Sequence, residues 1–269
     1  MSLRFTILGC ASSGGVPRAG GLGEKGRWGA CDPNEPRNTR RRCALLVRKE
    51  GQGGTTTCVI DTGPDFRQQM LAANVERIDA AVYTHSHADH LHGIDDLRPF
   101  ALSARARIKV YMDEATFERA AHAFNYCFQA PPGSSYPPIL DRHLITPERL
   151  VEVDGDGGTV PFLPIPVQHG DITALGFRVG AAAYIPDVSA IDEAQIRSLH
   201  DLDVLIIDAL RYRAHGSHFT VEQALELSAR IRPKRTILTN MHVDLDYRTL
   251  AAELPSTVEP AYDGLEITL

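Results

Sequence analysis

Thr84-His85-Ser86-His87-Ala88-Asp89-His90 places three histidines and one aspartate within six positions of the chain. The residues before it, 78–83, are mostly apolar and predict a buried strand, so the cluster follows a strand end. Imidazole nitrogens and carboxylate oxygens are the ligands that zinc, manganese and iron prefer. A polar surface loop that happens to be rich in histidine is the alternative. The density of these side chains directly after a buried strand favours a metal site.

Further candidate ligands follow predicted strands elsewhere in the chain. They are His169 after 161–167, Asp187 after 181–185, His242 after 236–239 and Asp61 after 57–60. A single histidine or aspartate after a strand is common and means little by itself. A binuclear site, however, needs more donors than one loop can supply. Together with the first cluster, these residues therefore favour such a site.

The bulk composition indicates a soluble globular protein. Hydrophobic residues make up 43% of the chain and charged residues 23%. The formal net charge of -6 counts against a general role on nucleic-acid backbones. The chain starts with a strand-like run rather than a long apolar signal segment, and no stretch approaches the length of a membrane span. We therefore expect a cytoplasmic location.

Five cysteines are scattered along the chain without a Cys-x-x-Cys pair, which argues against a disulfide framework and a four-thiolate zinc site. The only dense basic run is Arg40-Arg41-Arg42. Two interpretations of this run stay open. It is either a solvated turn before the strand predicted at 43–48, or a local anchor for one phosphate.

Short strands and helices alternate in both halves of the chain, which predicts an α+β fold with two sheet layers between helices. No linker or low-complexity tract divides the chain. We expect a single domain over residues 1–269, with two halves that meet near 160–165. Thr220 and Gln223 form a capping-box pattern at the start of a helix. The Pro-rich segment 131–138 predicts a rigid loop, with a lid or a dimer contact as the alternative.

The spacing of the first cluster, His-x-His-x-Asp-His, resembles the signature of the metallo-β-lactamase superfamily. This resemblance implies a four-layer αββα sandwich with two divalent metal ions, zinc or manganese, at one edge of the sheets. The ligands that it implies are His85, His87 and His169 on one metal and Asp89, His90 and His242 on the other, with Asp187 bridging.

The resemblance also implies residues that support the ligands. Asp61 would orient a metal-bound histidine through the second ring nitrogen, and His92 is a further candidate for such a role. The last motif reads Thr-Asn-Met-His over 239–242. His242 is thus displaced by two residues from the position that the family uses, and Asn240 is the alternative ligand.

Within the superfamily the chain is most similar to the PhnP-like and tRNase Z-like phosphodiesterase branch. The segments that carry this similarity are Gly15-Val16-Pro17, Arg41-Arg42, 169–177, Ile206-Ile207-Asp208, Ser217-His218 and 262–267. Lactamases and glyoxalase-type thioesterases usually carry Thr-Pro-Gly-His-Thr at the third ligand site, where this chain has Val-Gln-His-Gly-Asp over 167–171. PhnP has a structural zinc held by a cysteine cluster. Only Cys31 is present in the corresponding loop, so we predict no such zinc here.

The branch implies a binuclear phosphodiesterase that acts on small or cyclic nucleotide-type phosphodiesters. Two cations held together can activate water and clamp phosphoryl oxygens, so Asp89 is among the predicted catalytic residues. His218 matches the general acid of the branch and would contact the substrate and protonate the leaving group. His215 is the alternative proton donor.

The loop after the first strand is a candidate for substrate binding. Ser13, Gly14 and Gly15 could present backbone amides to the substrate, although a tight turn alone explains the glycines.

The acidic charge and the lack of a basic arm make tRNA cleavage less favoured. We therefore expect a small phosphodiester or nucleotide substrate, no membrane, no extended nucleic-acid surface, and a homodimer as the assembly common among relatives. Two other functions stay open. One is a thioesterase or lactonase on the same fold, and the other is a metal-binding module without turnover.

Overall fold

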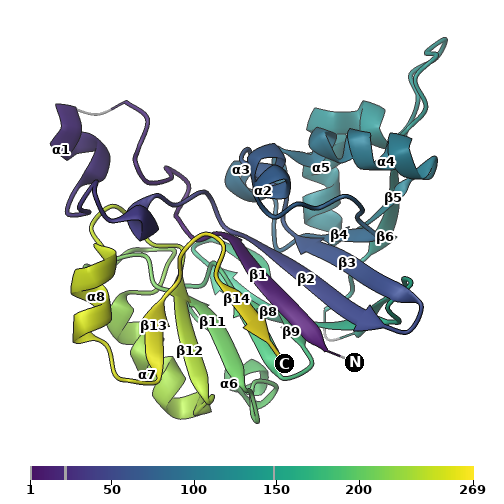
Figure 1. The fold of residues 1–269 in the computed structure, drawn as a ribbon. Helices are drawn as coiled ribbons and strands as arrows, with labels where there is room; N and C mark the ends of the chain where they lie inside the picture. Colours follow the sequence, from purple (N-terminus) through teal and green to yellow (C-terminus); the bar gives the residue numbers. More distant parts are fainter. Residues whose placement is uncertain (1, 21–22, 148) are drawn as a thin grey trace.

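Two seven-stranded sheets pack face to face, and helices cover their outer faces (Figure 1). The computed structural model describes residues 2–20, 23–147 and 149–269. This layering confirms the αββα sandwich that the sequence predicts. Within the described part of the chain, no helix is both long and apolar enough to cross a bilayer.

The first sheet is built mainly from the N-terminal half. Its strand order is β14 (Glu266–Thr268), β1 (Leu3–Gly9), β2 (Ala44–Gly51), β3 (Gly54–Ile60), β4 (Ala80–Val82), β5 (Ile108–Met112) and β6 (Leu140–Leu144). The helical segments of this half are α1 (Gly23–Trp28), η1 (Pro36–Asn38), α2 (Phe66–Ala72), α3 (Ala88–Leu91), η2 (Ile94–Leu97), α4 (Arg98–Ala104) and α5 (Glu114–Phe128). Strands β3 to β6 run parallel.

The second sheet is built from the C-terminal half. Its strand order is β13 (Val258–Pro260), β12 (Arg235–Thr239), β11 (Val204–Asp208), β10 (Ala182–Ile185), β9 (Ile172–Val179), β8 (Val160–His169) and β7 (Val151–Val153). Its helices are α6 (Glu193–Arg197), α7 (Val221–Ile231) and α8 (Tyr247–Glu253). Strands β10 to β13 run parallel. The predicted capping box of Thr220 and Gln223 is confirmed at the start of α7.

The chain passes from the first sheet to the second between β6 and β7, ahead of the 160–165 region where the halves are expected to meet. The last strand, β14, then returns to the first sheet beside β1. The amide of Leu3 donates to the carbonyl of Leu269 at 3.0 Å. The two ends of the chain therefore lie side by side (Figure 1).

Alternation along the strands forms two separate cores. On β2, Leu45 and Val47 face the second sheet, whereas Leu46 faces the helices α2, α4 and α5. Successive side chains of a strand point to opposite faces of the sheet, so one strand contributes side chains to both cores. Phe162 and Phe177 fill the inter-sheet core. Each fully buried side chain of this kind contributes roughly 1.5–3 kcal/mol to folding.

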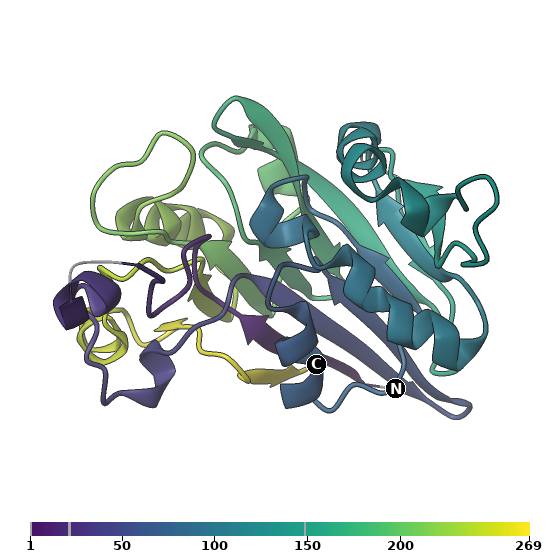
Figure 2. The ribbon, with the colours of Figure 1, turned by 90° about the horizontal axis from the view of Figure 1, so that it is seen from above.

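The carboxyl ends of the parallel strands in the two sheets lie at one edge of the sandwich. In the first sheet these are β3 and β4, and in the second they are β10, β11 and β12. Figure 2 looks down on the loops that leave this edge. Any ligand residue that directly follows one of these strands is therefore brought to the same place.

The basic run Arg40-Arg41-Arg42 is neither a solvated turn nor a free phosphate anchor. Arg40 is only 2% exposed and donates to the sulfur of Cys31 and to backbone carbonyls of the segment 242–245. Arg41 pairs with Asp263 at 2.9 Å, and Arg42 pairs with Asp65 at 3.0 Å. The run attaches the first long loop to three other parts of the chain. Both interpretations taken from the sequence are therefore wrong.

Gly63 tests how closely the loop after β3 approaches helix α3, which follows β4. A Cβ at this position would overlap the carbonyl oxygen of Asp89 in α3. We expect Gly63→Ala to lower the free energy of unfolding by about 1–3 kcal/mol, the usual cost of overpacking, and to weaken metal binding because α3 must shift. Urea denaturation and metal titration measure the two effects. Gly216→Ala is the control, since a Cβ there meets open space. Unchanged stability and metal affinity in Gly63→Ala would contradict this description.

Candidate metal centre

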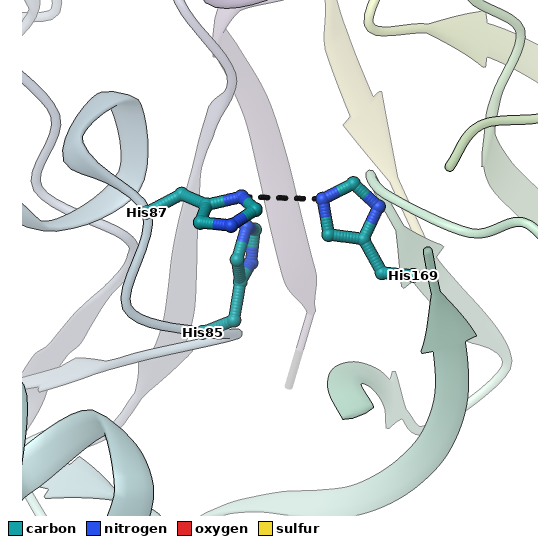
Figure 3. A group of neighbouring side chains, drawn as sticks. All are labelled: His85, His87 and His169. Atoms are coloured by element: carbon teal, nitrogen blue, oxygen red, sulfur yellow. Dashed lines mark hydrogen bonds between the residues drawn. The ribbon is translucent and has the colours of Figure 1, made fainter. Parts of the chain in front are cut away.

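Three histidines from both sheets converge at the edge of the sandwich (Figure 3). His85 and His87 follow β4, and His169 ends β8. One ring nitrogen of each lies within 4.8 Å of the others, and His87 Nδ1 is 3.2 Å from His169 Nε2. The other nitrogen of His169, Nδ1, donates to the carbonyl of Ser217 at 2.7 Å. This bond aims Nε2 at the other two rings.

A second group lies beside the first and contains carboxylates. His90 Nε2 is 3.1 Å from Asp187 Oδ2 and 3.5 Å from Asp89 Oδ2. His85, His90 and Asp187 together form a cluster of ligand atoms within 4.8 Å. Burial disfavours the charged imidazole of His90, but the surrounding carboxylates outweigh it and raise the pKa of His90. The group thus concentrates negative charge that calls for a cation.

The atoms of both groups fit divalent metal ions. His85 Nε2 is buried and has no hydrogen-bond partner among the described residues, and the only close partner of the buried Asp187 Oδ2 there is the ring nitrogen of His90 at 3.1 Å. A buried polar atom without a partner costs about 1–3 kcal/mol. Burial lowers the pKa of His85, which keeps the ring neutral and its lone pair available. Imidazole and carboxylate donors of this kind suit zinc and manganese.

Asp61 supports the histidines from behind. Its carboxylate is fully buried and accepts from His90 Nδ1 at 2.8 Å, from the amide of Thr84 at 2.8 Å and from the Thr84 hydroxyl at 2.8 Å. The Thr84 oxygen lies 3.0 Å from His85 Nδ1. Both rings therefore turn their Nε2 atoms away from Asp61 and toward Asp187. The predicted supporting role of Asp61 is consistent with this geometry.

His218 lies beside Asp187 and is held by Asp208. His218 Nδ1 is 2.9 Å from Asp208 Oδ2 and 3.6 Å from Asp187 Oδ1. Its ring centroid is 4.7 Å from that of His169, and one ring nitrogen groups with His169 and Asp187. This contact of Asp208 was not predicted from the sequence. The available signal was an aspartate at the end of a buried strand, the same pattern that identified Asp61.

Asp208 and His218 form a hydrogen-bonded pair, and the pKa of each group is raised. Burial raises the pKa of the Asp208 carboxyl to about 7, against the opposing effect of His218. Burial also disfavours the charged form of His218, but the hydrogen bond and charge of Asp208 outweigh it and raise the pKa of His218.

His242 does not lie with the other predicted ligands. None of the three metal-type groups found in the described residues contains it. Its amide donates to the carbonyl of Leu210 at 2.9 Å, and its Nδ1 is 3.0 Å from an Asp244 oxygen. The backbone of Asn240 is left-handed, with φ of 60°, and directs the following residues away. The structure does not support His242 as a ligand.

Asn240, the alternative ligand, occupies the position beside Asp187. Its Nδ2 donates to Asp187 Oδ1 at 3.3 Å and to Asp208 Oδ1 at 3.1 Å. It also lies 3.0 Å from His218 Nδ1. Asn240 therefore connects Asp187, which lies between the two metal groups, to the pair of Asp208 and His218.

The surroundings of His92 and Gly15 differ from those predicted. His92 is exposed, and its ring packs against Phe124 with centroids 5.6 Å apart rather than against a ligand. Ser13 and Gly14 are exposed at the turn after β1, and the amide of Gly15 donates to the carbonyl of Ser12 at 2.8 Å. With φ of 66°, Gly15 is explained by this turn, and its amide is not available to a substrate.

Comparisons with known proteins agree with this geometry. The family model described as "Beta-lactamase superfamily domain" matches residues 56–241. A crystal structure described as a new diphosphatase from the PhnP family is 33% identical, with a TM-score of 0.87 over 100% of this chain and 98% of that one. Zn²⁺-bound PqqB from Methylobacterium extorquens has a TM-score of 0.75 at 17% identity, covering 99% and 100%, which shows a likeness of fold alone.

A curated relative, an octanoyltransferase of Porphyromonas gingivalis, is 30% identical over 98% of this chain but only 51% of its own length. The chain thus spans about half the length of that relative. The family match extends from β3 to the end of the Asn240 segment and so contains every ligand group described above. With this match and the αββα layers, the chain belongs to the metallo-β-lactamase superfamily.

Proposed function

We propose that this metal-dependent hydrolase cleaves small nucleotide-type phosphodiesters at a binuclear metal centre. The observation that carries the proposal is the pair of His218 and Asp208 beside the metal-type groups, because it can supply a proton to a leaving oxygen. The 33% identity to a protein described as a diphosphatase of the PhnP family also supports phosphate chemistry.

The donor atoms suggest how two ions would be held. His85, His87 and His169 would hold one ion, and Asp89 and His90 the other, with Asp187 between them. When bound, two divalent ions would supply an activated water and neutralise charge on the phosphoryl oxygens. Asp61 would keep the rings of His85 and His90 in place through its three hydrogen bonds.

His218 would serve as the general acid of the proposed reaction. Its Nδ1 is occupied by Asp208, so its Nε2 is the nitrogen left to donate to a leaving oxygen. His215, the alternative donor, has no such carboxylate among its described partners and instead contacts the amide and hydroxyl of Ser217 through Nδ1. Burial and the charge of His218 lower the pKa of His215. The geometry therefore favours His218 as the proton donor.

Removal of His218 tests the proton donor. We expect His218→Ala to reduce kcat for a phosphodiester with a nucleoside leaving group by about 10²–10⁴-fold, the usual contribution of a general acid. The loss should be much smaller for bis(p-nitrophenyl) phosphate, because nitrophenolate leaves without a proton. Steady-state kinetics on both substrates measure the difference, and His122→Ala on an exposed face is the control.

Metal content must be measured on the same preparations. His218→Ala should retain the ions of the unmodified protein. A parallel loss of metal and of activity on both substrates would show that His218 is a ligand rather than an acid.

Asp187 is expected to be needed for metal binding because its carboxylate faces both groups. Asp187→Asn preserves the shape of the side chain but removes the charge, so at least one ion per chain should be lost after dialysis. Elemental analysis measures this stoichiometry. Asp171→Asn, at an exposed position near His169, is the matched control and should keep both ions. Full occupancy in Asp187→Asn would rule out a bridging role.

Asn240 makes the second ion position poorer in nitrogen donors than the first. We expect Asn240→His to supply a nitrogen beside Asp187 and to raise the affinity for the second ion, seen as a higher metal-to-protein ratio at limiting zinc. The same change removes the amide that bridges Asp187 and Asp208, so kcat should fall even as metal content rises. Unchanged metal binding would mean that Asn240 lies outside the ion's reach.

A further inference from the structure

Cationic and imidazole side chains continue outward from His218 along the loops that follow β11 and β12. These loops remain paired beyond the strand ends, since Ala209 N donates to Thr239 O at 3.0 Å and His242 N donates to Leu210 O at 2.9 Å. Arg211 and His242 therefore lie on the same edge as Asp208 and Asn240, a few residues further along each loop.

Arg211 is held in place by its own loop. Its guanidinium donates to the backbone carbonyls of Arg213 at 3.2 Å and Ala214 at 3.0 Å. The same loop carries His215, whose ring centroid is 5.2 Å from that of His218. These bonds hold the Arg211 guanidinium against the loop that carries His215.

Arg18 reaches this edge from the loop after β1. That loop is attached to the Asn240 segment by the amide of Ser12, which donates to Met241 O at 3.4 Å. The Arg18 side chain folds over Gly14, where an added Cβ would lie 2.9 Å from Nε. A side chain at position 14 would therefore displace Arg18.

The guanidinium of Arg18 lacks a full set of partners. Its Nε is buried and has no hydrogen-bond partner in the part of the chain that the structure describes. A buried N–H group of a cation lowers the stability of the folded protein when it has no hydrogen-bond partner. An anion that binds there would accept this hydrogen bond.

His242 lies within electrostatic reach of both arginines. Burial, followed by the charges of Arg18 and Arg211, lowers its pKa, although Asp244 opposes them. Arg18, Arg211 and His242 thus form one group, the distal cluster, with more positive than negative charge around it. Such a group concentrates anions from solvent.

We propose that the distal cluster binds a second phosphate of the substrate, so that the preferred substrate is a diphosphate ester of a nucleoside rather than a simple phosphodiester. The proposal rests on the proposed function, because it assumes that the first phosphate lies at the metal centre. Guanidinium groups suit this role, since their planar array of donors matches phosphate oxygens. The distal cluster thereby discriminates substrates, whereas the metal centre and His218 carry the reaction.

Binding of two nucleotides to the metal-loaded full chain tests the proposal. The probes are AMP, which carries one phosphate, and α,β-methylene-ADP, which carries a second phosphate group. The methylene bridge between the two groups of α,β-methylene-ADP resists cleavage. Isothermal titration calorimetry should show that the unmodified protein binds α,β-methylene-ADP at least tenfold more tightly than AMP, a difference of about 1.4 kcal/mol. Arg18→Ala should reduce this preference to less than threefold and leave the affinity for AMP unchanged.

Two further variants make the result specific. Arg18→Lys keeps the charge without the planar array and should give an intermediate preference. Arg119→Ala removes an exposed arginine of α5 and should keep the full preference. Urea midpoints of all variants establish that they are folded.

Three outcomes would overturn the proposal. They are an unmodified protein without a preference for the second phosphate, an Arg18→Ala variant that keeps the tenfold preference, and an equal loss of affinity for both nucleotides. If the preference for α,β-methylene-ADP depends on Arg18 but the protein cleaves no phosphodiester, the distal cluster is supported and the proposed function is contradicted. Turnover of phosphodiesters without the preference would do the reverse.

Discussion

The metal centre depends on the buried carboxylate of Asp61. A carboxylate removed from water is stable only when its oxygens are fully bonded, and here the donors are two groups of Thr84 and the ring of His90. Burial raises the pKa of Asp61, and the charge and hydrogen bond of His90 oppose that rise. The backbone of Asp61 is left-handed, with φ of 66°, a conformation that aspartate tolerates better than most residues. These bonds join the end of β3 to the loop after β4, so the strained turn and the orientation of the histidine rings stabilise each other.

Parallel pairing explains why residues far apart in the sequence meet. Asp61 follows β3 and His85 follows β4, whereas Asp187 follows β10, Asp208 ends β11 and Asn240 follows β12. In each sheet these strands are parallel neighbours, so their carboxyl ends share an edge. The inter-sheet core, with Phe162 and Phe177 at its centre, brings the two edges together. The position of each ligand is therefore set by strand register and core packing rather than by the loops alone.

The sequence was sufficient for the elements that local patterns determine. The strands near the ligands and the capping box of α7 were predicted because hydrophobic period and local capping are short-range signals. The sequence was insufficient where the position of a side chain depends on contacts with residues far away along the chain. The buried position of Arg40 comes from carbonyls of the segment 242–245, which no local pattern reveals. His92 stands close to the ligand motif, yet a helical turn directs it toward Phe124 instead.

The left-handed turn at Asn240 accounts for the largest difference between prediction and structure. A histidine ring has two nitrogens on opposite sides, whereas an amide nitrogen offers two hydrogens close together, which suits the neighbouring carboxylates of Asp187 and Asp208. An asparagine tolerates the positive φ at this position better than most residues do. The same turn carries His242 out of the metal centre and toward Arg18 and Arg211. One change in backbone direction thus removes a nitrogen from the second ion position and adds an imidazole to the distal cluster.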